Sequence, residues 1–359
     1  MNFASDNIVG ASRPVLDAIV AANGGALAAY GYDTVTQRVE RTFNELFERE
    51  VSTTLMATGT GANALALSAI VPPYGLCVCH AEAHVIDDEC GAPEFFMHGA
   101  KLIGLPGAGA KIAPRTLQAY LDGLPASVKQ MPPKALTISQ VTECGLVYGL
   151  DEIRALADVA HARGLLVHMD GARFANALVS LGCTPAEMTW KAGVDVLTFG
   201  ATKNGCLAAE AVVFFDPALA ESILLRRKRS GHTLSKGRLL SAQFEGYFAA
   251  DHWLDNARHA NAMAERLAGG LTALPGVRLA WERMANEVFC ILPEALAVAL
   301  RGEGAAFHTW SSQSLPEGEQ VCEGETMIRL VASFATDPAD VERFIAAARA
   351  HATRPRAAE

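Results

Sequence analysis

Two short polar segments, each placed directly after an apolar run, constrain the fold of this 359-residue chain more than any other feature. The run 165–167 leads into the carboxylate of Asp170, and the run 194–199 leads into the amine of Lys203. Such runs are typical of buried strands in a parallel sheet, which helices cover on both faces. Open α/β sheets bind their ligands beyond the carboxyl ends of the strands. We therefore expect both side chains to face one site at that edge.

An amine and a carboxylate in this arrangement suit a cofactor that carries both an aldehyde and a pyridine ring. Lys203 would form a Schiff base with the aldehyde. Asp170 would keep the ring nitrogen protonated, so that the ring accepts electrons from a carbanion. Pyridoxal 5'-phosphate has both groups. The structural alternatives are a solvated surface lysine and a carboxylate that caps a helix or a turn.

A third motif lies in residues 54–70, where an apolar run breaks into the turn Thr58-Gly59-Thr60-Gly61-Ala62-Asn63 and then continues as a helix-like run. The start of a helix after a glycine-rich turn presents free backbone amides, and we expect those near Gly59 and Thr60 to bind a phosphate. The turn also fits the dinucleotide pattern G-x-G-x-x-A. This motif alone therefore leaves open a nicotinamide cofactor and an ordinary tight loop.

Alternating strand-like and helix-like segments predict an α/β fold with a mostly parallel sheet. The expected strands are 135–138, 165–167, 194–199 and 210–215, and the expected helix 151–163 would start at Asp151 and end at Gly164. After about residue 251 we expect a long helix at 252–269, short strands at 277–280, 288–292 and 327–330, a final helix from 337 and a frayed tail from 353. The predicted division is a large domain of residues 1–250 and a small α+β domain of residues 251–359.

Composition and charge exclude several classes of protein. The chain is 50% hydrophobic and 19% charged, which is typical of a globular enzyme with a substantial core. A net charge of -9 gives no general attraction for nucleic acid or an anionic membrane. Neither a signal-peptide pattern nor a membrane-length apolar segment is present, so we expect a cytoplasmic protein. The eight cysteines contain no C-x-x-C pair, which predicts reduced thiols without a disulfide framework or a zinc cluster.

Taken in order, several segments resemble the low-specificity L-threonine aldolases, which have the aspartate-aminotransferase fold, also called fold type I. The matching segments are 3–7, 30–33, 58–63, 83–84 with Glu89, 168–173, 200–205 and 328–331, so the resemblance spans nearly the whole chain. It implies a pyridoxal-phosphate-dependent large domain with a seven-stranded, mostly parallel sheet, followed by a small C-terminal domain. It also implies a homodimer or homotetramer whose active sites are shared between subunits.

The resemblance implies a role for each candidate site residue. Lys203 would hold the cofactor covalently, and Asp170 would pair with the ring nitrogen. His84 would stack on the ring, and His84, Glu89 or a water would take the proton of the substrate hydroxyl. The other candidates are Gly59 and Thr60 for the phosphate, Arg173 for cofactor and substrate, Ser5, Tyr30 and Arg329 for the substrate, and Arg238 or Lys228 for the cofactor phosphate of the neighbouring subunit. Surface salt bridges and a structural histidine are the alternatives.

Two local patterns limit these assignments. His80 and His84 form H-A-E-A-H, but this order differs from the metalloprotease motif H-E-x-x-H, so we predict no metal. Many family members have Asn-Thr-His, with a histidine that approaches the substrate hydroxyl, where this chain has Val141-Thr142-Glu143-Cys144-Gly145. That second histidine is absent, which leaves open the identity of the base and the preferred side-chain configuration.

The predicted function is retro-aldol cleavage of L-threonine, L-allo-threonine or a related β-hydroxy-α-amino acid, such as a phenylserine, to glycine and an aldehyde. Another fold type I activity, β-elimination or transamination, would use the same Lys203 and Asp170. A nicotinamide-dependent dehydrogenase would leave both residues without a role. A non-catalytic binding protein would form no covalent link with a cofactor.

Overall fold

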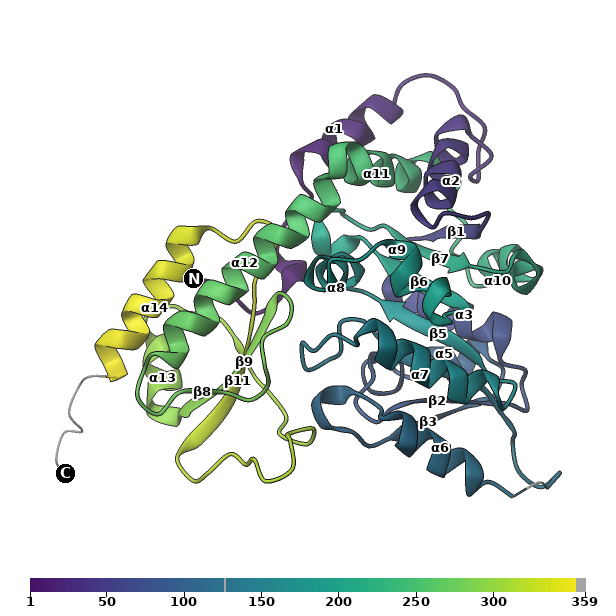
Figure 1. Ribbon diagram of the computed structural model, residues 1–359. Helices are drawn as coiled ribbons and strands as arrows, with labels where there is room; N and C mark the ends of the chain where they lie inside the picture. The colour runs from purple at the N-terminus through teal and green to yellow at the C-terminus, as the bar shows by residue number, and fades with distance from the viewer. Residues whose placement is uncertain (126, 353–359) are drawn as a thin grey trace.

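The computed structural model describes residues 1–125 and 127–352, and within them the chain forms two β-sheets (Figure 1). The larger sheet has seven strands in the order β1-β7-β6-β5-β4-β2-β3. Its strands are β1 (Ser52–Met56), β2 (Leu76–His80), β3 (Lys101–Leu105), β4 (Pro133–Ser139), β5 (Leu166–Gly171), β6 (Val196–Gly200) and β7 (Glu210–Phe214). Only β7 runs against its neighbours β1 and β6, and the other adjacent pairs are parallel. The predicted mostly parallel α/β sheet is confirmed.

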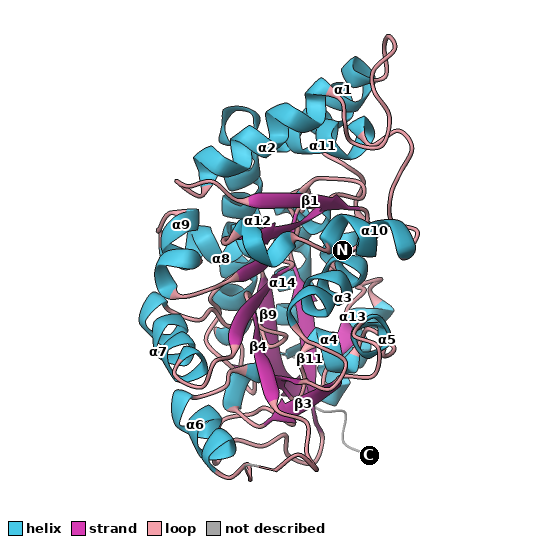
Figure 2. Ribbon diagram, turned by 90° about the vertical axis from the view of Figure 1, so that its right-hand side faces the viewer, coloured by secondary structure: helices cyan, strands magenta, loops and turns pink. Residues whose placement is uncertain are grey.

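Helices cover both faces of this sheet (Figure 2). One face carries α6 (Pro114–Asp122), α7 (Leu150–His161), α8 (Phe174–Leu181) and α9 (Pro185–Met188). The opposite face carries α3 (Gly59–Ile70), α4 (His84–Asp87), α5 (Ala92–Phe96) and α10 (Ile223–Arg229). Beyond β1 lie α1 (Arg13–Ala22), α2 (Thr34–Leu46) and α11 (Arg238–Phe248). This covering explains the continuous apolar runs, because every residue of β2, β6 and β7 is buried.

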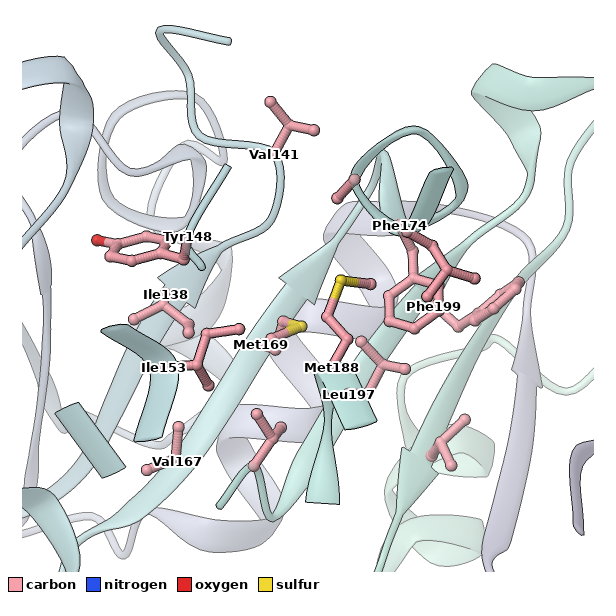
Figure 3. Packing of buried hydrophobic residues seen from close by; sticks show 14 of the residues in the cluster. Ile138, Val141, Tyr148, Ile153, Val167, Met169, Phe174, Met188, Leu197 and Phe199 are labelled. Carbon is pink, nitrogen blue, oxygen red and sulfur yellow. The ribbon is translucent and has the colours of Figure 1, made fainter. Parts of the chain in front are cut away.

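The core of the large sheet fixes the neighbouring strands β5 and β6 against their helices (Figure 3). Val167 and Met169 lie on the same face of β5, because they are two positions apart, and they belong to one buried cluster with Leu197 and Phe199 of β6. Ile153 of α7 closes the same cluster. Each such side chain stabilises the fold by roughly 1.5–3 kcal/mol when fully buried. The carboxyl ends of the two strands are therefore held rigidly side by side.

The second sheet is antiparallel and has the order β10-β11-β9-β8 within the described residues. Its strands are β8 (Arg278–Leu279), β9 (Glu287–Pro293), β10 (His308–Thr309) and β11 (Glu325–Val331), and its helices are α12 (His252–Thr272), α13 (Glu294–Gly302) and α14 (Pro338–Ala352). Phe3 packs edge-on against Phe344 in this second core, with 5.3 Å between the ring centroids. The N-terminal residues therefore reach the small sheet, while α12 runs from that sheet to α8 and α11 (Figure 1). We keep the division into residues 1–250 and 251–359 as a proposal.

The predicted helix 151–163 needs a correction at both ends, and at its carboxyl end it stops at His161. It begins one residue earlier, at Leu150, and its N-cap is Gly149 rather than Asp151. Glu152 supplies the capping carboxylate, because its Oε2 accepts a hydrogen bond of 2.7 Å from the backbone amide of Gly149. Asp151 lies in the first turn and pairs with Arg154.

Three further expectations concern the chain as a whole. The tail predicted from residue 353 lies outside the described residues. The eight cysteines are free thiols in the described part of the chain. None of the helices described there is both long and apolar enough to cross a bilayer.

Candidate functional site

The carboxyl ends of the parallel strands border a cavity of about 320 Å³. Most of the residues that line it lie at the ends of β1, β2, β4, β5 and β6 or soon after them, and they include many of the sequence-predicted candidates. These are Gly59, Thr60, His84, Asp170, Arg173 and Lys203. The structure thus brings together, at one edge of the sheet, side chains that the sequence separates by more than a hundred residues.

Asp170 and Lys203 reach this cavity through the closely packed ends of β5 and β6. Asp170 is paired in register with Thr198 of the neighbouring parallel strand. A Cβ atom at Gly200 would lie 2.7 Å from the Cα of Ala172, so only glycine lets the end of β6 approach the turn after β5.

Lys203 lies in the short 3-10 turn η4 (Thr202–Asn204), and the next residue anchors that turn. The Nδ2 of Asn204 donates to the hydroxyl of Tyr247 and to the carbonyl oxygen of Trp253, each at 2.8 Å. The lysine amine itself is not needed for these contacts. It is therefore available to the cavity that it lines.

The glycine-rich segment predicted as a turn before a helix is itself the beginning of α3, which starts at Gly59 and not after Asn63. The Oγ1 of Thr58 accepts a hydrogen bond of 3.1 Å from the amide of Gly61 and so caps the helix. A Cβ atom at Gly61 would lie 2.5 Å from the ring of His232, which explains a glycine at this position. The first amides of the helix, at Gly59 and Thr60, have no partner within it and border the cavity. This end of α3 is suited to bind an anion.

Asn63 connects two buried carboxylates beside the cavity, a role that sequence analysis missed. Its Nδ2 donates to Asp170 Oδ2 and to Glu89 Oε1, each at 2.8 Å. Asp170 Oδ1 accepts a further hydrogen bond of 3.0 Å from the backbone amide of Ala172. Both carboxylate oxygens of Asp170 are therefore fixed in orientation. The sequence signal that could have indicated this role is the position of Asn63 at the end of the glycine-rich segment.

Glu89 holds His84 at the mouth of this network. His84 Nδ1 lies 2.8 Å from Glu89 Oε1, and that hydrogen bond raises the pKa of His84. Burial raises the pKa of Glu89. A proton shared between the two groups thus lies next to Asp170 and within reach of the cavity.

The ligand-type atoms of His84, Glu89 and Asp170 lie within 4.8 Å of one another, which is a spacing that a cation could use. The hydrogen bonds made by Asn63 and His84 already account for this proximity. His80, the other histidine of H-A-E-A-H, has both ring nitrogens engaged, with the amide of Glu82 and the carbonyl of Gly107, each at 3.0 Å. The absence of a metal stays a prediction.

Arg173 is held by two buried carboxylates that sequence analysis did not assign. Its Nε and Nη2 donate to Asp6 at 2.7 and 3.1 Å, and its Nη1 lies 3.3 Å from Glu287 Oε2. Burial opposes the charge of the guanidinium, but Asp6 and Glu287 outweigh it and raise the pKa of Arg173. Burial raises the pKa of Glu287, although Arg173 counteracts it. The arginine is thus rigid and charged at the cavity wall.

Ser5 has a local role in this structure. Its Oγ accepts a hydrogen bond of 3.1 Å from the amide of Asn7 and caps the turn η1 (Asp6–Ile8). Asn7, not Ser5, is the residue of this turn that lines the cavity.

Three other candidates lie outside the cavity in a single chain. Arg329 lines a neighbouring cavity of about 490 Å³, with its guanidinium carbon 4.1 Å from the ring centroid of Trp310. Tyr30 lines another cavity of about 260 Å³, beside the end of α10. Arg238 donates to the carbonyl oxygens of Gly24 and Gly25, each at 3.2 Å.

Buried polar atoms without hydrogen-bond partners gather around the main cavity. Within the described residues they include Asn63 Oδ1, Glu89 Oε2, Glu143 Oε2 and both carboxylate oxygens of Glu287, which is ion-paired with Arg173. Each such atom costs about 1–3 kcal/mol, so folded proteins contain few of them away from functional sites. Their concentration here marks a site that is built for a polar ligand.

The chain is similar over most of its length to known proteins. The beta-eliminating lyase family matches residues 2–294. The low specificity L-threonine aldolase of Pseudomonas sp. (strain NCIMB 10558) is 43% identical over 308 residues, which cover 86% of this chain and 89% of that protein. The low specificity L-threonine aldolase of Pseudomonas aeruginosa is 41% identical over 335 residues, which cover 93% and 96%.

A solved structure of a threonine aldolase has the same fold as this chain. Leishmania major threonine aldolase superposes with a TM-score of 0.89 at 29% identity, covering 97% of this chain and 98% of that one. The fold type I architecture and the resemblance stated from the sequence are confirmed. The chain belongs to the beta-eliminating lyase family, in which it groups with the low-specificity L-threonine aldolases.

Proposed function

We propose that the chain is a pyridoxal-phosphate-dependent aldolase that cleaves L-threonine, L-allo-threonine or a related β-hydroxy-α-amino acid to glycine and an aldehyde. One observation carries the proposal: Lys203, Asp170 and the start of α3 border a single cavity. The predicted enzyme class, a carbon–carbon lyase that depends on pyridoxal phosphate, agrees with the family to which the chain belongs.

The donor set fits each part of this cofactor. The Lys203 amine would bind the aldehyde, the Asp170 carboxylate would hold the pyridine nitrogen, and the first amides of α3 would bind the phosphate. When bound, pyridoxal phosphate supplies an electron-accepting ring that stabilises negative charge at the α-carbon of the substrate. Hydrogen bonds from Asn63 and Ala172 fix the Asp170 carboxylate, which would hold it in position for the ring nitrogen.

Arg173 would orient the substrate by its carboxylate. Two of the five guanidinium N–H groups donate to Asp6, and Nη1 forms an ion pair with Glu287, which leaves N–H groups on both terminal nitrogens for a ligand. Two such groups match the two oxygens of a carboxylate. Arg329, Ser5 and Tyr30 remain proposed substrate contacts. Orientation by the carboxylate selects which bond at the α-carbon is broken.

The test of this function uses purified protein and three measurements. The protein should be yellow, borohydride should bleach and inactivate it, and untreated protein should convert L-threonine to equal amounts of glycine and acetaldehyde. Formation of ammonia and an oxo acid in place of glycine would instead indicate β-elimination. An aminotransferase would consume threonine only when an oxo acid is added.

We also propose that the active protein is a homodimer or homotetramer with shared sites, located in the cytoplasm. The basic run 226–229 and Arg238 lie near Tyr30 in one chain, where Lys228 Nζ is 5.4 Å from the Tyr30 ring centroid. His232, at the end of this region, packs against Gly61 at the start of α3. A cationic surface next to the phosphate-binding turn is suited to reach the phosphate of an adjoining subunit.

A mixed-subunit experiment tests the shared site. Arg238→Ala should weaken cofactor retention, because it removes a guanidinium partner of the phosphate, whereas Lys101→Ala at an exposed lysine should leave retention unchanged. Mixing Arg238→Ala subunits with Lys203→Ala subunits should restore activity, since one site of each mixed dimer is then complete. Sedimentation measures the oligomeric state. An active monomer, or inactive mixed dimers, would refute the shared site.

A further inference from the structure

Glu143 is a buried glutamate that the sequence-based assignment left without a role. It follows β4 and lines the main cavity together with Lys203 and Asp170. It also lines the neighbouring cavity of about 490 Å³ that contains Trp310 and Arg329. Glu143 therefore stands in the wall between the proposed cofactor site and a second space large enough for a substrate side chain.

One carboxylate oxygen of Glu143 is fixed and the other is free. Oε1 accepts hydrogen bonds from Ser139 Oγ at 2.6 Å and from the backbone amide of His84 at 2.9 Å. Oε2 is buried and has no hydrogen-bond partner among the described residues. The carboxyl group is thus held in one position with a vacant acceptor, which is the arrangement of a poised proton acceptor.

The electrostatic surroundings favour proton exchange near neutral pH. Burial raises the pKa of Glu143 to about 7, against the hydrogen bonds from Ser139 and His84, and the charge of Asp170 adds to the increase. The titratable and charged groups that line the two cavities with it are His84, Asp170, Arg173, Lys203 and Glu210 in the main cavity, and Glu82, Asp87, Asp88, Cys144, His308 and Arg329 in the neighbouring cavity. A carboxyl group of this pKa can both accept and return a proton at physiological pH.

The other acidic groups near the cavity are less suited to meet a substrate hydroxyl. Glu89 is not among the residues that line the cavity, and its Oε1 is shared by His84 and Asn63. Glu210 does line it, and burial raises its pKa to about 7 as well, against a hydrogen bond from Thr202, but Glu210 does not line the neighbouring cavity. Glu143 combines a free acceptor with a position between the two cavities.

We propose that Glu143 accepts the proton of the substrate β-hydroxyl. This inference rests on the proposed function. The hydroxyl O–H bond breaks and its proton moves to Glu143 Oε2, while a C=O double bond forms and the Cα–Cβ bond breaks. Pyridoxal phosphate, when bound, would supply the electron-accepting group for the electron pair of the broken bond, and the aldehyde leaves. A proton returned to Cα completes glycine. The substituent on Cβ would extend into the neighbouring cavity.

Two reactions of the holoenzyme separate this role from a structural one. Cleavage of L-threonine requires removal of the hydroxyl proton, whereas exchange of a glycine α-proton in D₂O uses Lys203 and Asp170 but involves no hydroxyl. Glu143→Gln keeps the shape and an Oε1 acceptor but cannot take the proton. We expect it to lower kcat/KM for threonine by about 10²–10⁴-fold and to leave glycine exchange within about threefold of wild type.

The matched control is Glu94→Gln, which changes another glutamate with a buried, unpartnered oxygen, on α5 and outside the cavities described above. It should leave both reactions unchanged. The pH profile gives a further readout. Because the base must be ionised, kcat/KM for threonine should rise through about pH 7 in wild type, and Glu143→Gln should lose this rise.

Each outcome decides the question. Wild type that neither binds the cofactor nor exchanges glycine refutes the proposed function itself. A Glu143→Gln variant that still cleaves threonine at the wild-type rate overturns the role of Glu143. If Glu143→Gln loses both reactions, Glu143→Asp distinguishes a proton acceptor from a structural residue. As a proton acceptor, Glu143→Asp should keep glycine exchange and part of the pH-dependent cleavage. Equal loss of both reactions in Glu143→Asp would show a merely structural role and overturn the proposal.

Discussion

Replacing Lys203 by alanine is expected to lower threonine cleavage by at least about 10⁴-fold, comparable to the loss of a catalytic nucleophile. The fold should persist, because Asn204 and not Lys203 makes the hydrogen bonds that anchor this turn to Tyr247 and Trp253. The amine lines the cavity and is the only group proposed here to bind the cofactor aldehyde. Acetaldehyde formation measures activity, and thermal unfolding measures the fold.

The control for this variant is Lys101→Ala, at an exposed lysine at the start of β3. It removes the same functional group from the surface and should leave activity within about twofold of wild type. A Lys203→Ala variant with near wild-type turnover would exclude covalent activation through Lys203. A variant that unfolds at a much lower temperature would mean that the lysine has a structural role as well.

Replacing Asp170 by asparagine is expected to lower kcat for threonine by up to about 10³-fold. Two unit charges about 4 Å apart interact by roughly 4 kcal/mol at an effective dielectric constant of about 20, and each 1.36 kcal/mol is about a tenfold change in rate. Asparagine keeps the size of the side chain and an oxygen acceptor for the amide of Ala172, but it removes the charge that would hold the ring nitrogen protonated.

Glu89→Gln serves as the comparison, because Asn63 donates to both Glu89 and Asp170. Both variants disturb the hydrogen bonds of Asn63, but only Asp170→Asn removes the charge proposed to face the cofactor. The expected loss of kcat is therefore smaller for Glu89→Gln. Steady-state kinetics and the visible spectrum of bound cofactor measure the difference. A loss below about tenfold for Asp170→Asn would count against its assigned role.

Local patterns predicted several strands of the large sheet and the glycine-rich segment at its edge. The apolar runs before Asp170 and Lys203 predicted buried strands, and β5 and β6 are there. Thr58 to Asn63 predicted a turn followed by a helix, and the helix α3 is there but already starts at Gly59, inside the predicted turn. These features could be predicted because hydrophobic periodicity and turn residues act over a few neighbouring positions. Local patterns do not fix the exact end of a helix. At the start of α7 the cap is Gly149 with Glu152, and not the predicted Asp151.

Only the tertiary structure decided which polar groups meet across elements. Asp6 and Glu287 lie far apart in the sequence, yet both hold Arg173, because the first residues of the chain pack beside β9. Glu143 reaches the amide of His84 because β4 and β2 are neighbours in the sheet.

Such contacts depend on strand register and on the packing of distant segments, and a shift of one residue in register would turn each side chain to the other face. The sequence alone determined that a lysine, a carboxylate and a glycine-rich segment would lie at one edge of a sheet. The folded chain decided which buried carboxylates surround them, because burial and the loss of water make those interactions strong only after the segments pack together.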